Sequence, residues 1–180
     1  DNVSDETKEK LEKESSGLDI HYTSIGSSAG TFHNVFMDSF NLDDDTIVYF
    51  LENDYIHAPN SMNALFDGFD IGAHYVTLYD HPDKYIASHD YGESTRVMKG
   101  DVCHWKMTIS TTMTFAAKVS TLTEDKDIWI ENTGGSYPTD HQAFTQLREK
   151  GRTLVSPIPG YSTHGETAWL SPFRNWGELI

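Results

Sequence analysis

The chain has 180 residues, enough for one domain, and its 37% hydrophobic and 12% aromatic residues exclude a chain that is disordered by composition. Its formal net charge of -15 argues against nonspecific binding to nucleic acid or to an anionic membrane surface. An anionic nucleotide stays open as a ligand, because a metal ion and helix amino ends can supply local positive charge.

Cysteine usage and hydropathy indicate the kind of cellular compartment in which the protein is found. Cys103 is the only cysteine, so no disulfide can form within the chain, and a reducing compartment is favoured. No apolar run is long enough to span a bilayer. We therefore expect residues 1–180 to form a single domain of a cytoplasmic protein, either soluble or peripheral.

The amino-terminal segment begins without a strand. Residues 1–14 are polar and charged, with a helical pattern at Thr7–Leu11, and the first predicted strand is short, at Leu18–Tyr22. A doubly wound sheet usually begins with a strand before its first helix. The sequence therefore predicts that the complete protein has a first strand that this chain lacks, and a genuine helical start is the alternative.

A Gly/Ser loop at residues 24–28 leads into an amphipathic helix over residues 29–40, with Ser27 or Ser28 as its N-cap. Such a loop at a helix amino end can hold phosphate or sugar, so Ser28 is a candidate donor-binding residue. Asn34, on the helix, could bond a ribose or orient a carboxylate. An ordinary turn and a surface asparagine are the alternatives.

The apolar run Thr46–Leu51 predicts a buried strand of a parallel sheet, and it ends in the triplet Glu52-Asn53-Asp54. Ligands of open α/β sheets bind at the carboxyl edge of the strands. Oxygen ligands two residues apart at that edge suit Mg²⁺ or Mn²⁺ shared with a diphosphate. Acidic residues that merely end a strand are the alternative. The aspartates of the preceding turn, residues 43–45, lie at the strand's amino end and predict a solvated turn.

The next segment predicts a helix and a second strand. The helix covers Ser61–Phe69 and the strand Ala73–Tyr79, and the inner side of the helix is predicted to carry Met62, Leu65, Phe66 and Phe69. The strand ends in a polar loop, residues 80–83, as a crevice shared by two strand ends requires. Asp80 would contact sugar or acceptor, or else cap the turn before Pro82.

Residues 95–119 are rich in Thr, Val, Met and aromatic residues, and a turn signal at Gly100-Asp101 predicts a hairpin or long bent strands. Residues 108–114 are predicted to form an exposed or edge-strand face. His104 and Trp105 could line an acceptor groove, where the indole would stack on the apolar face of a sugar. A tryptophan buried in the core is the alternative for Trp105.

The last third predicts a helix at Thr121–Trp129, a loop over residues 131–138, a helix from Asp140 to Lys150 and a strand at Thr153–Val155. Thr139 or Asp140 is the expected N-cap of the second helix. A carboxylate at that position can also face the crevice, so Asp140 is a candidate general base.

His164 lies in a polar segment that follows the prolines at positions 157 and 159. A proline-restricted turn would fix its position. An imidazole is a good third ligand for a borderline metal such as Mn²⁺, and a surface histidine is the alternative.

The run SSAGTFHNVFMDSFNLDDDTIVYFLENDYIHAP resembles the core signature of nucleotide-sugar glycosyltransferases of the GT-A fold. The segments YVTLYDHPDKY, TTMTFAA, PTDHQAF and PIPGYSTHGETAWL are similar to a smaller group of these enzymes, which includes a glycosyltransferase domain of a chlorella virus that builds capsid glycans. This resemblance implies a GT-A-like (Rossmann-like) α/β fold, with a mixed, mostly parallel sheet flanked by helices.

The resemblance also implies roles for individual residues. The family's acidic motif, which binds the donor, falls on Glu52-Asn53-Asp54. Asp54 would ligate the metal, Glu52 would bond the ribose or a metal-bound water, and His164 would complete the metal site. Asp140 matches the base of inverting members. The motif departs from the commonest D-x-D form, since Glu52 stands at its first position.

The activity implied is metal-dependent transfer of a hexosyl group from a nucleotide-diphosphate sugar to a glycan hydroxyl, with inversion and with Mn²⁺ or Mg²⁺ as cofactor. Two other functions stay open. One is a metal-dependent hydrolase that uses Glu52, Asp54 and His164. The other is an inactive carbohydrate-binding remnant.

Overall fold

The computed structural model describes residues 1–86 and 95–179. Its α-helices are α1 (Asp5–Glu14), α2 (Ser28–Ser39), α3 (Ser61–Asp70), α4 (Val119–Glu124), α5 (Lys126–Asn132) and α6 (Asp140–Glu149). Its strands are β1 (Ile47–Phe50), β2 (Tyr55–His57), β3 (Tyr75–Val76), β4 (Val97–Lys99), β5 (His104–Met107), β6 (Phe115–Lys118), β7 (Leu154–Ile158) and β8 (Ser162–His164). Three short 3₁₀ helices are η1 (Pro82–Tyr85), η2 (Thr167–Trp169) and η3 (Trp176–Glu178).

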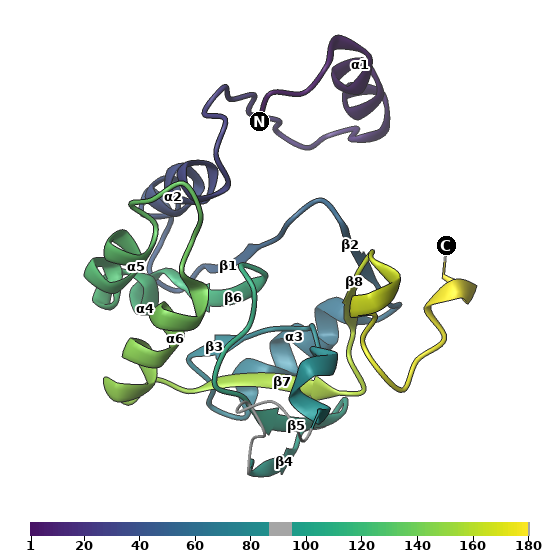
Figure 1. The fold of residues 1–180 in the computed structure, drawn as a ribbon, viewed down its shortest axis with the longest axis vertical. Coiled ribbons are helices and arrows are strands. Elements are labelled where there is room, and N and C mark those ends of the chain that lie inside the picture. Colours follow the sequence, from purple (N-terminus) through teal and green to yellow (C-terminus); the bar gives the residue numbers. More distant parts are fainter. Residues whose placement is uncertain (87–94, 180) are drawn as a thin grey trace.

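The fold is mixed α/β, built on a six-stranded sheet in the order β1-β6-β3-β7-β5-β4 (Figure 1). Only β3 and β7 run parallel among the described strand pairs of this sheet, so the prediction of a mostly parallel sheet was wrong. The strand after α2 was also predicted as buried and parallel, yet β1 lies at the sheet edge, pairs antiparallel with β6 and buries only Phe50. A short apolar run indicates packing on its faces and carries no information on strand direction.

The sheet separates two hydrophobic cores, because neighbouring strand residues such as Tyr75 and Val76 point to opposite faces. Figure 1 shows α2, α4, α5 and α6 gathered on one side, and α3 lies along β3 and β7. The core under the four helices is rich in aromatic rings, and Phe115 stacks on Trp129 at a centroid distance of 4.7 Å. This layering of helices on both faces is what the alternation of helical and strand patterns predicts.

The amino-terminal segment differs from the prediction. α1 is confirmed, but it buries no residue and stands apart from the sheet at the top of Figure 1. Residues 18–22 form no strand, and Leu18 is 73% exposed. The contacts of this segment include the Asp1 carboxylate, which accepts hydrogen bonds from the N–H groups of Ile25 and Gly26. A pentapeptide that alternates apolar and polar residues becomes a strand only where a neighbour satisfies its backbone, and no described strand lies beside this one.

The interior face of α3 is set by a buried aspartate. Ala64, Leu65 and Gly68 face the sheet, whereas Met62 and Phe66 are exposed, contrary to the prediction. Asp67 is 5% exposed, and its carboxylate accepts hydrogen bonds from the N–H groups of residues 101 and 102 and from Trp105 Nε1 at 2.8 Å. These bonds turn the Asp67 side of the helix inward and tie α3 to the β4–β5 hairpin.

Replacing Asp67 with alanine should lower the free energy of unfolding by about 3 kcal/mol, because three donors would lose their acceptor inside the protein. Chemical denaturation measures this loss. Asp70→Ala is the matched control, since Asp70 is exposed on the same helix, and its effect should stay within about 0.5 kcal/mol. Equal effects of the two substitutions would contradict the structural role of Asp67.

The hairpin predicted around Gly100-Asp101 is confirmed as β4 and β5. Trp105 is fully buried between α3 and the sheet, so it lines no groove, and His104 is exposed at the start of β5. Residues 108–114 were predicted to form an exposed or edge-strand face, but they lie outside the described strands and four of their hydroxyl residues are buried: Thr108, Ser110, Thr111 and Thr114. Hydrogen bonds explain this burial, since Thr111 and the Thr114 carbonyl both bind Thr77 Oγ1.

Candidate functional site

A two-stranded ribbon, β2 with β8, brings the acidic triplet to the polar carboxy-terminal segment. Tyr55 stands opposite His164, and the Gly165 N–H donates to the Asp54 carbonyl at 2.7 Å. The Asp54 Oδ2 and His164 Nε2 atoms lie 3.1 Å apart. His164 Nδ1 accepts from the Glu166 N–H at 3.1 Å, so Nε2 is the nitrogen that faces Asp54. The structure thus brings together two of the predicted metal ligands.

Glu52, the third predicted ligand, is electrostatically coupled to this pair. Desolvation by the surrounding protein, followed by repulsion from Asp54 and Asp140, raises the pKa of the Glu52 carboxyl, and His164 acts in the opposite direction. A carboxylate that two others repel is stabilised by a bound cation. The region is therefore an electronegative site in which Asp54 and His164 are in direct contact.

The donor set can be compared with what a divalent ion requires. Within residues 1–86 and 95–179, no three His, Cys, Asp or Glu side chains converge as a metal site. The side chain of Asp54 is 50% exposed, and that of His164 is 21% exposed. One carboxylate and one imidazole fit Mn²⁺ or Mg²⁺ when diphosphate oxygens and water complete the coordination.

A polar cleft of about 210 Å³ is connected to this pair through Tyr55, whose ring contacts His164 and whose hydroxyl contacts Thr112 in the cleft lining. It is lined by the η1 segment, the loop before β6 and the first residues of α6, which contribute His81, Asp83, Lys84, Ser110, Thr111, Thr112, Asp140 and His141. The side chains of Lys84 and His141 both contact the Ser110 hydroxyl. Lys84 Nζ is 3.0 Å and His141 Nδ1 is 3.3 Å from Ser110 Oγ. The cleft can therefore bind a ligand rich in hydroxyl groups.

Asp140, the candidate base, lines the cleft from the first turn of α6. Its carboxylate accepts from the His141 N–H at 2.7 Å. Thr139 occupies the N-cap position without a capping side-chain bond, and its hydroxyl donates to Asn132 instead. Burial raises the pKa of the Asp140 carboxyl, against the opposing influence of the His141 N–H and of the charges on His141, Lys84 and His81.

Tyr55 joins the two parts of the site. Its ring lies 5.3 Å from the ring of His164, and its hydroxyl is 2.8 Å from Thr112 Oγ1 in the cleft. Asp140 also contributes to the raised pKa of Glu52. Tyr55 therefore connects the Asp54–His164 pair to the cleft that Asp140 lines.

The remaining predicted donor-binding residues lie outside this cluster of contacts. Ser28 opens α2 directly after Ser27, whose hydroxyl caps the helix by accepting from the Gly30 N–H. Asn34 is exposed and donates to Asp38 on the same helix at 3.4 Å. Asn53 is exposed in the turn between β1 and β2. In the described part of the chain, no hydrogen bond joins these residues to Asp54 or His164.

The loop after β3 contributes to the cleft, but not through Asp80. His81 and Asp83 line the cleft, whereas Asp80 is fully buried. Asp80 Oδ1 lies 2.7 Å from Lys106 Nζ, and Oδ2 accepts from the Tyr85 hydroxyl at 2.7 Å. Neither expectation for Asp80, contact with a sugar or a turn cap, matches this role as a buried ion-pair partner.

Sequence reasoning missed Tyr55, Lys84 and Thr112 as site residues. Tyr55 follows the acidic triplet directly, and this position next to the triplet is the sequence signal that could have identified it. Lys84 and Thr112 carried no such signal, because a lysine after a proline turn and a threonine in a Thr-rich run are common on surfaces.

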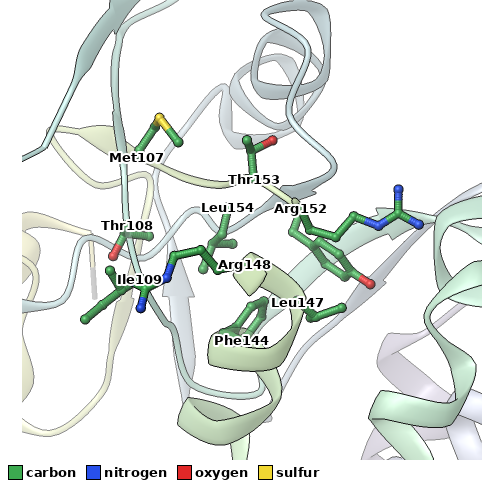
Figure 2. A pocket seen from close by; sticks show the side chains of 10 residues that line it. Met107, Thr108, Ile109, Phe144, Leu147, Arg148, Arg152, Thr153 and Leu154 are labelled. Atoms are coloured by element: carbon green, nitrogen blue, oxygen red, sulfur yellow. The ribbon is translucent and has the colours of Figure 1, made fainter. Parts of the chain in front are cut away.

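A second hollow, of about 30 Å³, lies between α6, β7 and residues 107–109 (Figure 2). Figure 2 shows apolar side chains such as Phe144, Leu147 and Leu154 around it, with Arg148 and Arg152 at its margin. This volume admits water molecules and excludes a substrate. The polar cleft is the better candidate for ligand binding.

Comparison of the sequence with protein-family models gives no match, and a search of curated proteins gives none either. Within residues 1–86 and 95–179, the structure contains no helix with the length and apolar character that crossing a membrane requires.

Proposed function

We propose that the protein is a metal-dependent glycosyltransferase of the GT-A type, which moves a sugar from a nucleotide-diphosphate donor to a glycan hydroxyl with inversion. The observation that carries this proposal is the Asp54–His164 contact, which Tyr55 connects to a polar cleft that Asp140 lines. The resemblance of residues 24–176 to such enzymes supports it, as does the mixed sheet with helices on both faces. A cytoplasmic location belongs to the same proposal.

Asp54 and His164 would hold Mn²⁺ or Mg²⁺, and Glu52 would bond a coordinated water or the ribose. When bound, the ion would neutralise the developing charge of the diphosphate leaving group. Asp54 keeps half of its side chain accessible, which leaves room for donor oxygens. The Glu166 N–H fixes the imidazole of His164 so that Nε2 faces this position.

Asp140 is the proposed general base. Its carboxylate would take the proton of the acceptor hydroxyl, whose oxygen then forms a bond to the anomeric carbon. The bond from that carbon to the diphosphate oxygen breaks on the opposite face, so the configuration inverts. The raised pKa of Asp140 makes it a stronger base than an ordinary aspartate. Lys84 and His141, which meet at Ser110, are positioned to bind hydroxyl groups of the acceptor.

The direct test is binding of nucleoside diphosphates with and without Mn²⁺, measured by thermal shift and calorimetry, followed by turnover of the sugar forms of any ligand found. Stabilisation that requires both nucleotide and Mn²⁺, with turnover that rises when a glycan is added, supports the proposal. Turnover that ignores every added glycan would identify a hydrolase. Glycan binding without nucleotide or metal dependence would identify a carbohydrate-binding protein.

Replacing Asp54 with alanine should abolish the Mn²⁺-dependent part of nucleotide affinity, because it removes the carboxylate in contact with His164. Calorimetry with and without Mn²⁺ measures this change. Asp43→Ala is the control, since Asp43 lies in the exposed turn before β1 and was predicted to be solvated. If Asp54→Ala retained the full Mn²⁺ effect, Asp54 would not be a metal ligand.

Gly165→Ala should weaken the same metal-dependent binding without unfolding the protein. A Cβ at position 165 would lie 2.9 Å from the Asp54 carbonyl oxygen, so the backbone that carries Asp54 must shift. We expect about a 10-fold loss of Mn²⁺-dependent affinity, of the size seen when groups that orient a metal ligand are disturbed. Gly134→Ala is the control, because its added Cβ would have no neighbour closer than 3.8 Å. Equal binding by both variants would contradict the role of the tight β2–β8 pairing.

A further inference from the structure

A row of aromatic rings leads from the Asp54–His164 pair to the protein surface. The His164 ring contacts Tyr55 at a centroid distance of 5.3 Å, and Tyr55 contacts Tyr79 at 5.4 Å. Tyr79 contacts His81 at 5.0 Å, and His81 contacts Trp169 at 5.4 Å. His81 also lines the polar cleft. Trp169 therefore stands at the rim of the candidate site.

Trp169 differs from the other tryptophans of the chain. All four lie in the described ranges, and Trp105, Trp129 and Trp176 are at most 2% exposed, whereas Trp169 is 42% exposed. Its backbone is fixed, since its carbonyl accepts from the Tyr79 hydroxyl at 2.6 Å and its N–H donates to the Glu166 carbonyl at 2.9 Å. The indole is thus held in place while much of its apolar surface stays open to solvent.

A second pair of rings comes from the segments that also carry His81 and Trp169. Phe173 is 73% exposed and contacts Tyr85, itself 44% exposed, at a centroid distance of 5.6 Å. Phe173 has a φ of 67°, a left-handed conformation that is unfavourable for a bulky residue. Tyr85 is anchored by its hydrogen bond to the buried Asp80. We name Trp169, Phe173 and Tyr85 together the aromatic platform: Trp169 contacts His81, and His81 caps η1, which carries Tyr85.

We propose that the aromatic platform binds the sugar units of an uncharged acceptor oligosaccharide adjacent to the unit whose hydroxyl faces Asp140. This inference rests on the proposed function and specifies its acceptor. The C–H faces of a sugar ring stack on aromatic rings, while its hydroxyl rim requires hydrogen-bonding groups such as those of the neighbouring cleft. A protein of net charge -15, with Asp83 and Asp140 lining the cleft, disfavours an acidic glycan.

The test uses the full chain and an array of immobilised neutral and acidic glycans. We expect the wild type to bind neutral oligosaccharides of two or more units, and Trp169→Ala to bind them about 10-fold more weakly. Trp169→Phe should recover part of the loss, since it keeps a ring. Phe66→Ala is the control, because Phe66 is similarly exposed at 46% but lies on α3.

Intrinsic fluorescence tests the same inference in solution. Acrylamide quenching reports mainly on Trp169, because the other tryptophans are buried, and a glycan found on the array should protect it. The three buried tryptophans and the melting temperature report whether Trp169→Ala is folded, and the Tyr79 bond to the backbone carbonyl survives this substitution.

Several outcomes would overturn the inference: no glycan bound by the wild type, equal binding by Trp169→Ala, preference for acidic glycans, or protection of Trp169 only by a protein partner. Nucleotide binding with Mn²⁺ is measured separately. If it persists while glycan binding ignores Trp169, the platform inference fails and the proposed function stands. If Mn²⁺-dependent nucleotide binding is absent while Trp169 supports glycan binding, the proposed function fails.

Discussion

Asp140→Asn should lower the rate of sugar transfer by about 10³-fold while leaving Mn²⁺-dependent nucleotide binding unchanged. The amide has the shape of the carboxylate and can still accept from the His141 N–H, but it cannot take a proton from the acceptor. Initial rates with saturating donor measure the loss. Asp127→Asn is the matched control, because Asp127 occupies the first turn of α5 as Asp140 does that of α6 and is exposed.

The pH dependence of transfer gives a second readout for Asp140. A base works when it is deprotonated, so the rate should fall as the pH drops through its pKa. Burial raises that pKa, so the acid limb of the wild-type profile should lie above the range of an ordinary aspartate. Asp140→Asn should lose this limb. Normal turnover in the variant, or an unchanged acid limb, would remove Asp140 from the role of base.

Helices were the most predictable part of this fold. α2 and α6 follow from apolar spacing and polar starts, and the N-cap of α2 is Ser27, one of the two expected residues. The predicted helix at 121–129 is instead two helices that meet at Asp125. Asp125 is buried there by partners distant in sequence, which local pattern cannot reveal.

The sheet was less predictable, because strand direction and neighbour order depend on distant segments. β2 and β8 have three residues each and carry no periodic signal, yet their pairing joins Asp54 to His164. Those two residues were predicted from their chemical types and from the resemblance. Their contact depends on a ribbon that no local pattern indicated.

Aromatic residues show the same limit. Trp105 was considered for sugar stacking and is buried, whereas Trp169 is exposed beside the cleft. Trp105 and Trp169 both have apolar and polar neighbours in the sequence, so local composition does not reveal which of them is buried. The difference arises from tertiary contacts: Trp105 donates to the buried Asp67, whereas Trp169 contacts His81 and stays 42% exposed.

Asp125→Ala should lower the free energy of unfolding by about 3–5 kcal/mol, the largest stability loss that we predict. Asp125 is 1% exposed and lies within 2.8 Å of Arg152 Nε and 2.7 Å of Lys150 Nζ. It also accepts from the Tyr75 hydroxyl at 2.8 Å, and Tyr75 in turn accepts from Trp129 Nε1 at 3.1 Å. Its removal would leave the largely buried Arg152 without its main counter-charge and the Tyr75 hydroxyl without an acceptor.

Denaturation of Asp125→Ala and of Asp127→Ala at several pH values separates this network from a general effect of lost charge. Burial alone would raise the pKa of Asp125, but hydrogen bonds from Arg152, Lys150 and Tyr75 lower it. A lowered pKa contributes stability that is present above the unfolded-state value of about 3.9 and is lost as the pH falls through the folded value. The difference between wild type and Asp125→Ala should therefore be largest near neutral pH and shrink below about pH 4. Asp127 is exposed, so its replacement should change stability by less than about 0.5 kcal/mol at any pH. A pH-independent difference for Asp125→Ala would show that the ionised carboxylate does not tie α4 and α5 to the end of α6.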